Sequence, residues 1–188
     1  MKWLPKTIAL IDALTEFLGR IIAWLTLVMV ITMFAIVVLR YGFNIGWIAM
    51  QESVLYLHGI IFMLGAAYTL KADGHVRVDI FYHRFSAKQK AIVDLFGTIL
   101  LLLPVTIFIF MISFDYVANS WHILEKSPEA GGLPFVYLGK SLLLVLAVTL
   151  ALQGLAELAR NMQLLLSSSQ SQQKGNPPVV AKSLKEKK

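Results

Sequence analysis

Four long stretches of apolar residues occupy most of the 188-residue chain. Residues 21–39, 95–114 and 141–156 contain no charged residue, and residues 47–70 contain one, Glu52. A bilayer core about 30 Å thick needs about 20 apolar residues to be crossed by a helix, so each stretch, with its flanks, is long enough to span. Backbone polar groups cannot stay unpaired in lipid, so each stretch is expected to be helical. The sequence therefore predicts an all-α integral membrane protein with four transmembrane helices.

Three parts follow from these boundaries. We expect an N-terminal segment over residues 1–20, a transmembrane domain over residues 21–160, and a basic disordered tail over residues 161–188 that lies near anionic lipid headgroups. The four spans are expected at about residues 21–39, 47–70, 91–116 and 134–158.

The N-terminal segment carries apolar residues at roughly helical spacing. They are Trp3, Leu4, Ile8, Ile11, Leu14 and Leu18. This pattern favours an amphipathic helix that lies on the membrane surface before the first span. The alternative is a longer, tilted first helix with a polar beginning.

Composition and charge place the chain in the membrane with a defined orientation. The hydrophobic fraction is 57%, and no cysteine is present, which excludes disulfides, iron–sulfur clusters and cysteine-based zinc sites. All but three of the 17 lysines and arginines flank the spans on one side, the exceptions being Arg40, Lys126 and Lys140. By the positive-inside rule, both termini and the second loop are cytoplasmic. The net charge of +6 is thus explained by topology, and nucleic-acid binding is not expected.

Four charged residues are expected near one level of the four-helix bundle, close to its outer surface: Arg40, Glu52, Asp115 and Lys140. Ionisable groups at membrane depth are candidates for function. One interpretation is a site for an ion or substrate. The other, which we favour because the charges cancel, is a structural polar layer in which Glu52 pairs with Lys140.

Histidines and loop residues complete the candidate set. His58 is the only histidine well inside a span, so a haem held by two facing histidines is not expected, and His58 should hydrogen-bond to another helix or to a partner subunit. The second loop contributes His75, Arg77 and Asp79. The loops hold no phosphate-binding glycine pattern, metal-ligand spacing or nucleophile with its base, so the chain is expected to be neither an enzyme nor a cofactor carrier.

Several short motifs together resemble a known family. They are Arg40-Tyr41, Trp47 with Gln51-Glu52, Gly65-Ala66-Ala67-Tyr68, His75-Val76-Arg77-Val78-Asp79, Glu125-Lys126-Ser127-Pro128-Glu129, Gly131-Gly132-Leu133-Pro134 and Leu152-Gln153-Gly154. In a four-span chain this pattern resembles the small membrane subunit (DctQ type) of TRAP transporters, the tripartite ATP-independent periplasmic systems. The resemblance covers about residues 20–157.

The resemblance implies a role in a three-part importer of the bacterial inner membrane. The partners would be a large membrane subunit (DctM type), which carries an organic acid or related solute with sodium, and a periplasmic substrate-binding protein (DctP type). The small subunit would act as a scaffold. In it, Arg77 and Asp79 would stabilise the inner loop or the subunit contact, and Glu52 would support the outer polar layer. Two other classes stay open: a stand-alone four-helix transporter or channel, and the membrane anchor of a redox complex.

Overall fold

The computed structural model describes residues 4–74, 82 and 84–175, and the side chains as far as Ser167. Its elements are α1 (Leu4–Phe43), α2 (Ile48–Lys71), α4 (Ala87–Gly97), the π-helical turn η1 (Thr98–Leu102), α5 (Leu103–His122) and α6 (Val136–Gly175). Four helices are long and apolar enough to cross a membrane, with α4, η1 and α5 together forming the third. The expected all-α architecture with four candidate spans is confirmed.

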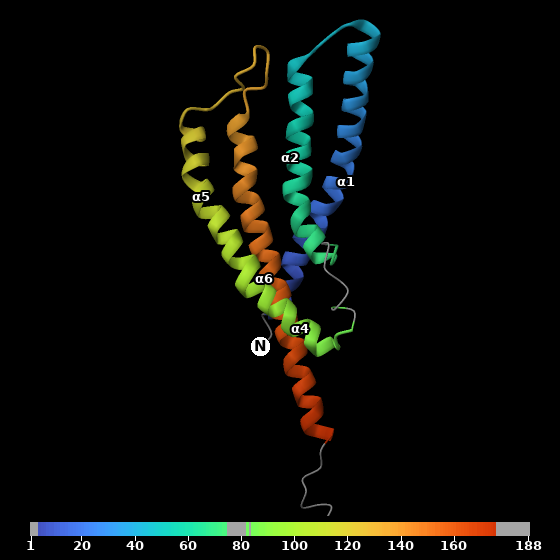
Figure 1. The fold of residues 1–188 in the computed structure, drawn as a ribbon, viewed down its shortest axis with the longest axis vertical. Coiled ribbons are helices and arrows are strands. Elements are labelled where there is room, and N and C mark those ends of the chain that lie inside the picture. The colour runs from blue at the N-terminus through green and yellow to red at the C-terminus, as the bar shows by residue number, and fades with distance from the viewer. Residues whose placement is uncertain (1–3, 75–81, 83, 176–188) are drawn as a thin grey trace, which may run out of the picture.

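The four spans form a single layer and not a closed bundle. From one edge to the other the order is α1, α2, α6 and α5, and each helix packs on the next (Figure 1). The α1–α2 and α5–α6 connections lie at one end, which we call the loop end. The opposite end, where α1 begins and α2 finishes, is the terminal end. Near this end α1 also reaches α6. The expected bundle is therefore wrong.

A single layer has little interior. The buried apolar residues in the described part of the chain are Val54, Ala67, Ala91, Val117, Ala147 and Ala156. Most large apolar side chains are exposed on the outside of the layer. In water this surface would cause aggregation, but in hydrocarbon it is compatible with lipid or with a neighbouring apolar subunit.

The first helix runs without interruption from Leu4 to Phe43, a length of 40 residues. At about 1.5 Å per residue it is about 60 Å long, twice the thickness of a bilayer core. The structure thus has the longer continuous helix that the sequence left as the alternative. Where its amphipathic beginning lies relative to the membrane surface stays a prediction.

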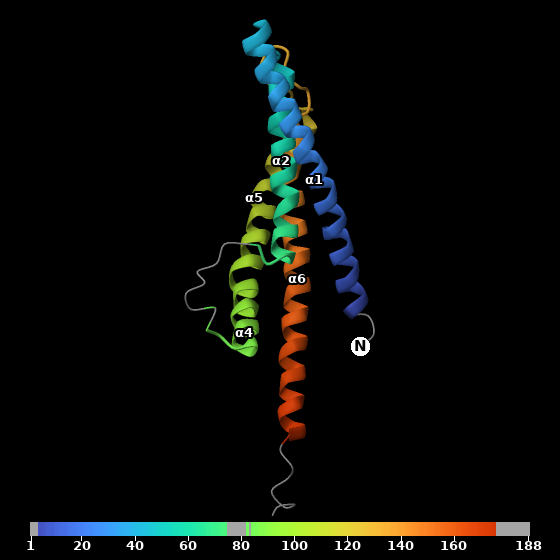
Figure 2. The same ribbon diagram turned by 90° about the vertical axis from the view of Figure 1, so that its right-hand side faces the viewer.

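The third span is a composite helix. It begins at a capping box, in which the Ser86 hydroxyl accepts from the Gln89 N–H and the Gln89 side chain accepts from the Ser86 N–H at 2.9 Å. The π-helical turn η1 ends at Leu102, two residues before Pro104, which has no N–H to donate to the carbonyl four residues back. Views along two directions show α4, η1 and α5 as one ribbon (Figure 2).

The fourth helix is longer than expected at its end. It begins at Val136 and continues to Gly175, so residues 161–175 are helical, where the sequence had suggested a disordered tail. The rest of the expected tail, residues 176–188, lies outside the described residues.

Close helix contact occurs at Gly19, not at the Gly65 that the family motif contains. A Cβ atom on Gly19 of α1 would lie 2.7–2.9 Å from ring carbons of Tyr68 on α2, whereas a Cβ on Gly65 meets no heavy atom within 4 Å. We expect Gly19→Ala to lower the free energy of unfolding by about 1–2 kcal/mol through overpacking. Gly65→Ala should be neutral or stabilising by less than about 1 kcal/mol. Thermal unfolding of both variants in detergent checks this, and equal behaviour of the two would contradict it.

Candidate functional site

Polar side chains gather at the terminal end, where α1, α2 and α6 meet. We call this set the terminal cluster, and its members are Asp12, Thr15, Glu16, Lys71, Gln153, Glu157 and Arg160. The helices differ in what they supply: α1 contributes two carboxylates and a hydroxyl, α2 an ammonium group, and α6 an amide, a carboxylate and a guanidinium.

Gln153 is the centre of the terminal cluster and is 0% exposed. Its amide oxygen accepts from the Thr15 hydroxyl of α1 at 2.9 Å, and its amide nitrogen donates to Glu157 at 3.3 Å. A buried amide costs free energy unless both of its ends are hydrogen-bonded, and here both are. Gln153 therefore links α1 to α6 in one fixed arrangement.

Ion pairs surround this amide. The Arg160 guanidinium donates to both carboxylate oxygens of Asp12 and to Glu157. Lys71 Nζ lies 2.8 Å from Glu16 and 3.1 Å from the carbonyl oxygen of Asp12. Two cations thus face three carboxylates. Since each is held by a partner, the terminal cluster is arranged to join three helices.

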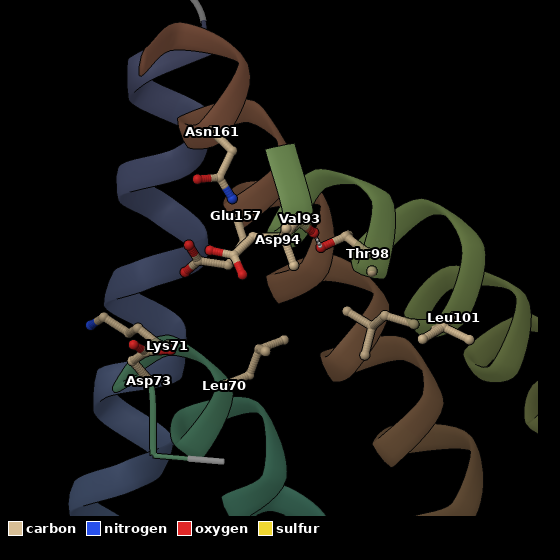
Figure 3. A pocket seen from close by; sticks show the side chains of 11 residues that line it. Leu70, Lys71, Asp73, Val93, Asp94, Thr98, Leu101, Glu157 and Asn161 are labelled. Atoms are coloured by element: carbon tan, nitrogen blue, oxygen red, sulfur yellow. Dashed lines mark hydrogen bonds between the residues drawn. The ribbon is translucent and has the colours of Figure 1, made fainter. Parts of the chain in front are cut away.

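A cavity of about 600 Å³ opens beside the terminal cluster, between the end of α2 and the helices α4, η1 and α6. Figure 3 shows Lys71 and Asp73 reaching it from α2 and the turn that follows, and Glu157 and Asn161 from α6. Asp94 on its α4 wall accepts a hydrogen bond from the Tyr82 hydroxyl at 2.8 Å. Across the described ranges no group of three or more His, Asp or Glu side chains could hold a metal ion.

Glu52 occupies a different position from the one expected. Its carboxylate accepts from the N–H of Leu133 at 2.6 Å and from the hydroxyl of Ser127. Both donors belong to the loop between α5 and α6. A Cβ on Gly132 would come within 2.7 Å of a Glu52 carboxylate oxygen, so only glycine lets the loop fold this closely over Glu52. Glu52 is an anchor for this loop, and the expected Glu52–Lys140 pair is wrong.

Lys140 pairs with Glu125 instead. Its Nζ lies 2.5 Å from the Glu125 carboxylate and 4.0 Å from the centre of the Tyr116 ring. The Ser120 hydroxyl donates to the same carboxylate at 2.6 Å. Beside this pair, Trp121 donates to the Ser141 hydroxyl at 2.7 Å. These contacts join α5 to α6 at the loop end.

The other sequence candidates are not brought together. Arg40 and Asp115 are exposed, and neither joins Glu52 or Lys140, so the four residues do not form one polar layer. His58 is also exposed, near the middle of α2. The second-loop candidates His75, Arg77 and Asp79 lie outside the described residues.

The terminal cluster is the part of the site that the sequence prediction missed, although signals for it exist. Asp12 and Glu16 are four residues apart and therefore share one face of a helix. Gln153 is a polar residue inside a charge-free stretch, followed at helical spacing by Glu157 and Arg160. What the sequence does not contain is the direction in which each face points.

The Lys140–Glu125 pair predicts a pH dependence. Hydrogen bonds from Lys140 and then Ser120 lower the pKa of Glu125, which lies in the connection between α5 and α6. Its contribution to stability is therefore complete above the ordinary value of 4.5 and is lost as the pH falls through the lower folded-state pKa. We expect the stability difference between the wild-type chain and Glu125→Gln to shrink below pH 4.5. Thermal unfolding in detergent at several pH values measures it, and a difference that is the same at all pH values would contradict the pairing.

Comparison with known families gives a match over most of the chain. The model of the family described as "Tripartite ATP-independent periplasmic transporters, DctQ component" matches residues 29–164, well over half of the chain. The matched region begins within α1 and ends within α6, so it contains the second and third spans whole and parts of the first and fourth. Comparison with curated proteins gives no match, and neither does comparison with solved structures. With four candidate membrane spans and a family match that includes all or part of each, the chain belongs to the DctQ family, a component of tripartite ATP-independent periplasmic transporters.

Proposed function

We propose that this chain is a fixed scaffold for the large, DctM-type subunit of its transporter and does not itself carry solute. The observation that supports this most directly is the single layer of spans. A solute pathway through a membrane protein has to be surrounded by protein, and four helices in one row enclose none (Figure 1). Such a layer instead offers two broad apolar faces, which suit packing against a large neighbour and against lipid.

The polar groups of the described residues support the same role. Terminal-cluster side chains bond to one another across three helices, and Glu52 and Lys140 both bond to residues of the α5–α6 loop. A site that binds and releases an ion and its solute needs groups that can exchange partners. Here the charged groups are used to fix helices and a loop.

The orientation of the chain in the membrane is inferred from the distribution of its lysines and arginines between the two ends of the spans. We propose that the terminal end is cytoplasmic and the loop end is periplasmic, in the inner membrane of a bacterium, because nearly all the positive charge flanks the terminal end. The beginning of α1 would then lie in or near the cytoplasmic membrane surface, with its apolar side against lipid.

The remaining partners and the cargo are proposed from the family alone. The periplasmic substrate-binding protein (DctP type) would approach the loop end, and the large subunit would import an organic acid or related solute with sodium. Within this assembly, His75, Arg77 and Asp79 would stabilise the second loop or its contact with the large subunit. The described residues carry no feature that selects one solute.

Affinity purification tests the scaffold role. The tagged chain, extracted in mild detergent from cells that make the whole system, should bring down a much larger integral subunit. The purified chain alone, reconstituted in vesicles, should show no solute flux. Flux from the chain alone would support the stand-alone transporter, and a Soret absorption band would support the redox anchor.

A further inference from the structure

His58 lies near the middle of the 24-residue helix α2, with its side chain exposed on the outside of the layer. Its ring stacks on Phe62 at 6.4 Å between centroids. Leu55, 70% exposed, and Phe62, 65% exposed, flank it on the same side of the helix. We call the surface formed by Leu55, His58 and Phe62 the His58 face.

The imidazole of His58 has no hydrogen-bond partner within the described part of the chain. Ten residues separate it from Ile48, so at about 1.5 Å per residue it lies about 15 Å from the loop end of α2. A histidine side chain is too short to reach water from that depth. An imidazole facing hydrocarbon would leave both ring nitrogens unsatisfied, which is unfavourable in the bilayer core. The His58 face is therefore poorly suited to lipid.

Other polar side chains on the exposed surface differ from His58. Thr26, Thr32 and Thr149 each donate to a carbonyl of their own helix, at 2.8–2.9 Å, and so tolerate lipid contact. Asp115 is exposed too, but it lies within two turns of the end of α5, closer to the headgroups. Compared with these described residues, His58 is the exposed polar group at mid-depth for which neither its own helix nor the bilayer offers a partner.

We propose that the His58 face is where a transmembrane helix of the large subunit packs, and that a polar side chain of that helix hydrogen-bonds to His58. This inference rests on the proposed scaffold function, and it names the surface that carries out that function. We choose the large subunit as the occupant because a tripartite transporter contains a second integral subunit. The contact should be a helix with a polar side chain, because the imidazole of His58 needs a hydrogen-bond partner. Aromatic and aliphatic neighbours on both sides of His58 supply the apolar contact area for such a helix.

Site-specific cross-linking locates the contact. Because the chain has no cysteine, a photoreactive maleimide attached to it is attached only at the introduced cysteine. Leu55→Cys and Phe62→Cys report on the His58 face. Phe108→Cys and Met111→Cys, at 62% and 70% exposure on α5, are matched controls at an edge of the layer. In membranes containing the whole transporter, the α2 positions should cross-link to the large subunit and the α5 positions should not.

Substitution of His58 tests the hydrogen bond. His58→Leu should reduce the affinity for the large subunit by about three- to tenfold, as expected for loss of one hydrogen bond in a membrane. His58→Gln, which keeps a donor and an acceptor, should retain most of the affinity. Thr32→Leu is the control, because that hydroxyl bonds within its own helix. The melting temperature of the isolated chain should not fall in His58→Leu, since the imidazole bonds to no other described group.

The outcomes separate the two proposals. If the wild-type chain brings down no large subunit, the scaffold function and this inference are both wrong. If the complex forms but cross-links arise equally from α2 and α5, or His58→Leu binds as well as the wild type, only this inference is overturned. Cross-linking of the α2 positions to a second copy of the same chain would also overturn it.

Discussion

Arg160→Met should lower the free energy of unfolding by about 2–3 kcal/mol, because it leaves the carboxylates of Asp12 and Glu157 without their shared cation. Breaking a fully buried ion pair costs about 3–5 kcal/mol, and the expected value is lower because these side chains are only partly buried. The effect should extend along α1, since Asp12 is one of the few groups that hold the beginning of this helix to α6.

A double-mutant cycle and a control sharpen this prediction. Asp12→Asn should cost less in the Arg160→Met background than in the wild type, because the interaction that it removes is already gone. Arg84→Met makes the same chemical change at an exposed position and should shift stability by less than about 0.5 kcal/mol. Thermal unfolding in detergent measures all four. Additive effects of Asp12→Asn and Arg160→Met would contradict the pairing.

The spans could be predicted from the sequence because the bilayer imposes a simple local rule. Residues 21–39 contain no charge, and only a helix of that length satisfies its backbone in hydrocarbon. The residues at which α1 begins and α6 ends are harder to predict from the sequence. Both helices continue well past the apolar stretches, and Pro5 of α1 stands in the first turn, where a proline is tolerated.

The arrangement of the spans could not be predicted, because in lipid the packing side of a helix need not be more apolar than its exposed side. For a soluble bundle an apolar stripe would have identified the interior. Here Leu55 and Phe62 are exposed whereas Thr15 and Gln153 are buried, the reverse of the usual pattern. A single layer and a closed bundle are therefore equally compatible with the sequence.

The sequence predicts toward which end of its helix each candidate residue lies, but not in which direction around the helix axis its side chain points. Glu52 and Lys140 were expected to pair because both lie a few residues inward from the same membrane surface. In the structure Lys140 bonds to Glu125, in the loop after α5, and Glu52 bonds to Ser127 and Leu133 of the same loop. These bonds depend on how the loop after α5 folds, which the spacing of residues within the spans does not encode.

Glu52→Leu should have an effect comparable to that of Arg160→Met, lowering the free energy of unfolding by about 2–4 kcal/mol. The variant removes two hydrogen bonds to a carboxylate, each worth about 1.5–3 kcal/mol, and the Leu133 N–H loses its acceptor. Glu52→Gln should cost no more than about 1.5 kcal/mol. Its amide oxygen can still accept from Leu133, and the Ser127 hydroxyl can rotate to accept from the amide nitrogen.

Release of the loop can be detected separately from unfolding of the spans, because Lys126 is an exposed trypsin site next to Ser127. Cleavage after Lys126 should be slow in the wild type, faster in Glu52→Leu, and near wild-type in Glu52→Gln. Glu129→Leu changes an exposed glutamate of the same loop and serves as the control, with little change expected. If Glu52→Leu leaves the cleavage rate unchanged, Glu52 does not anchor this loop. If Glu52→Gln instead cleaves as fast as Glu52→Leu, the negative charge itself holds the loop, since both hydrogen bonds remain available to the amide.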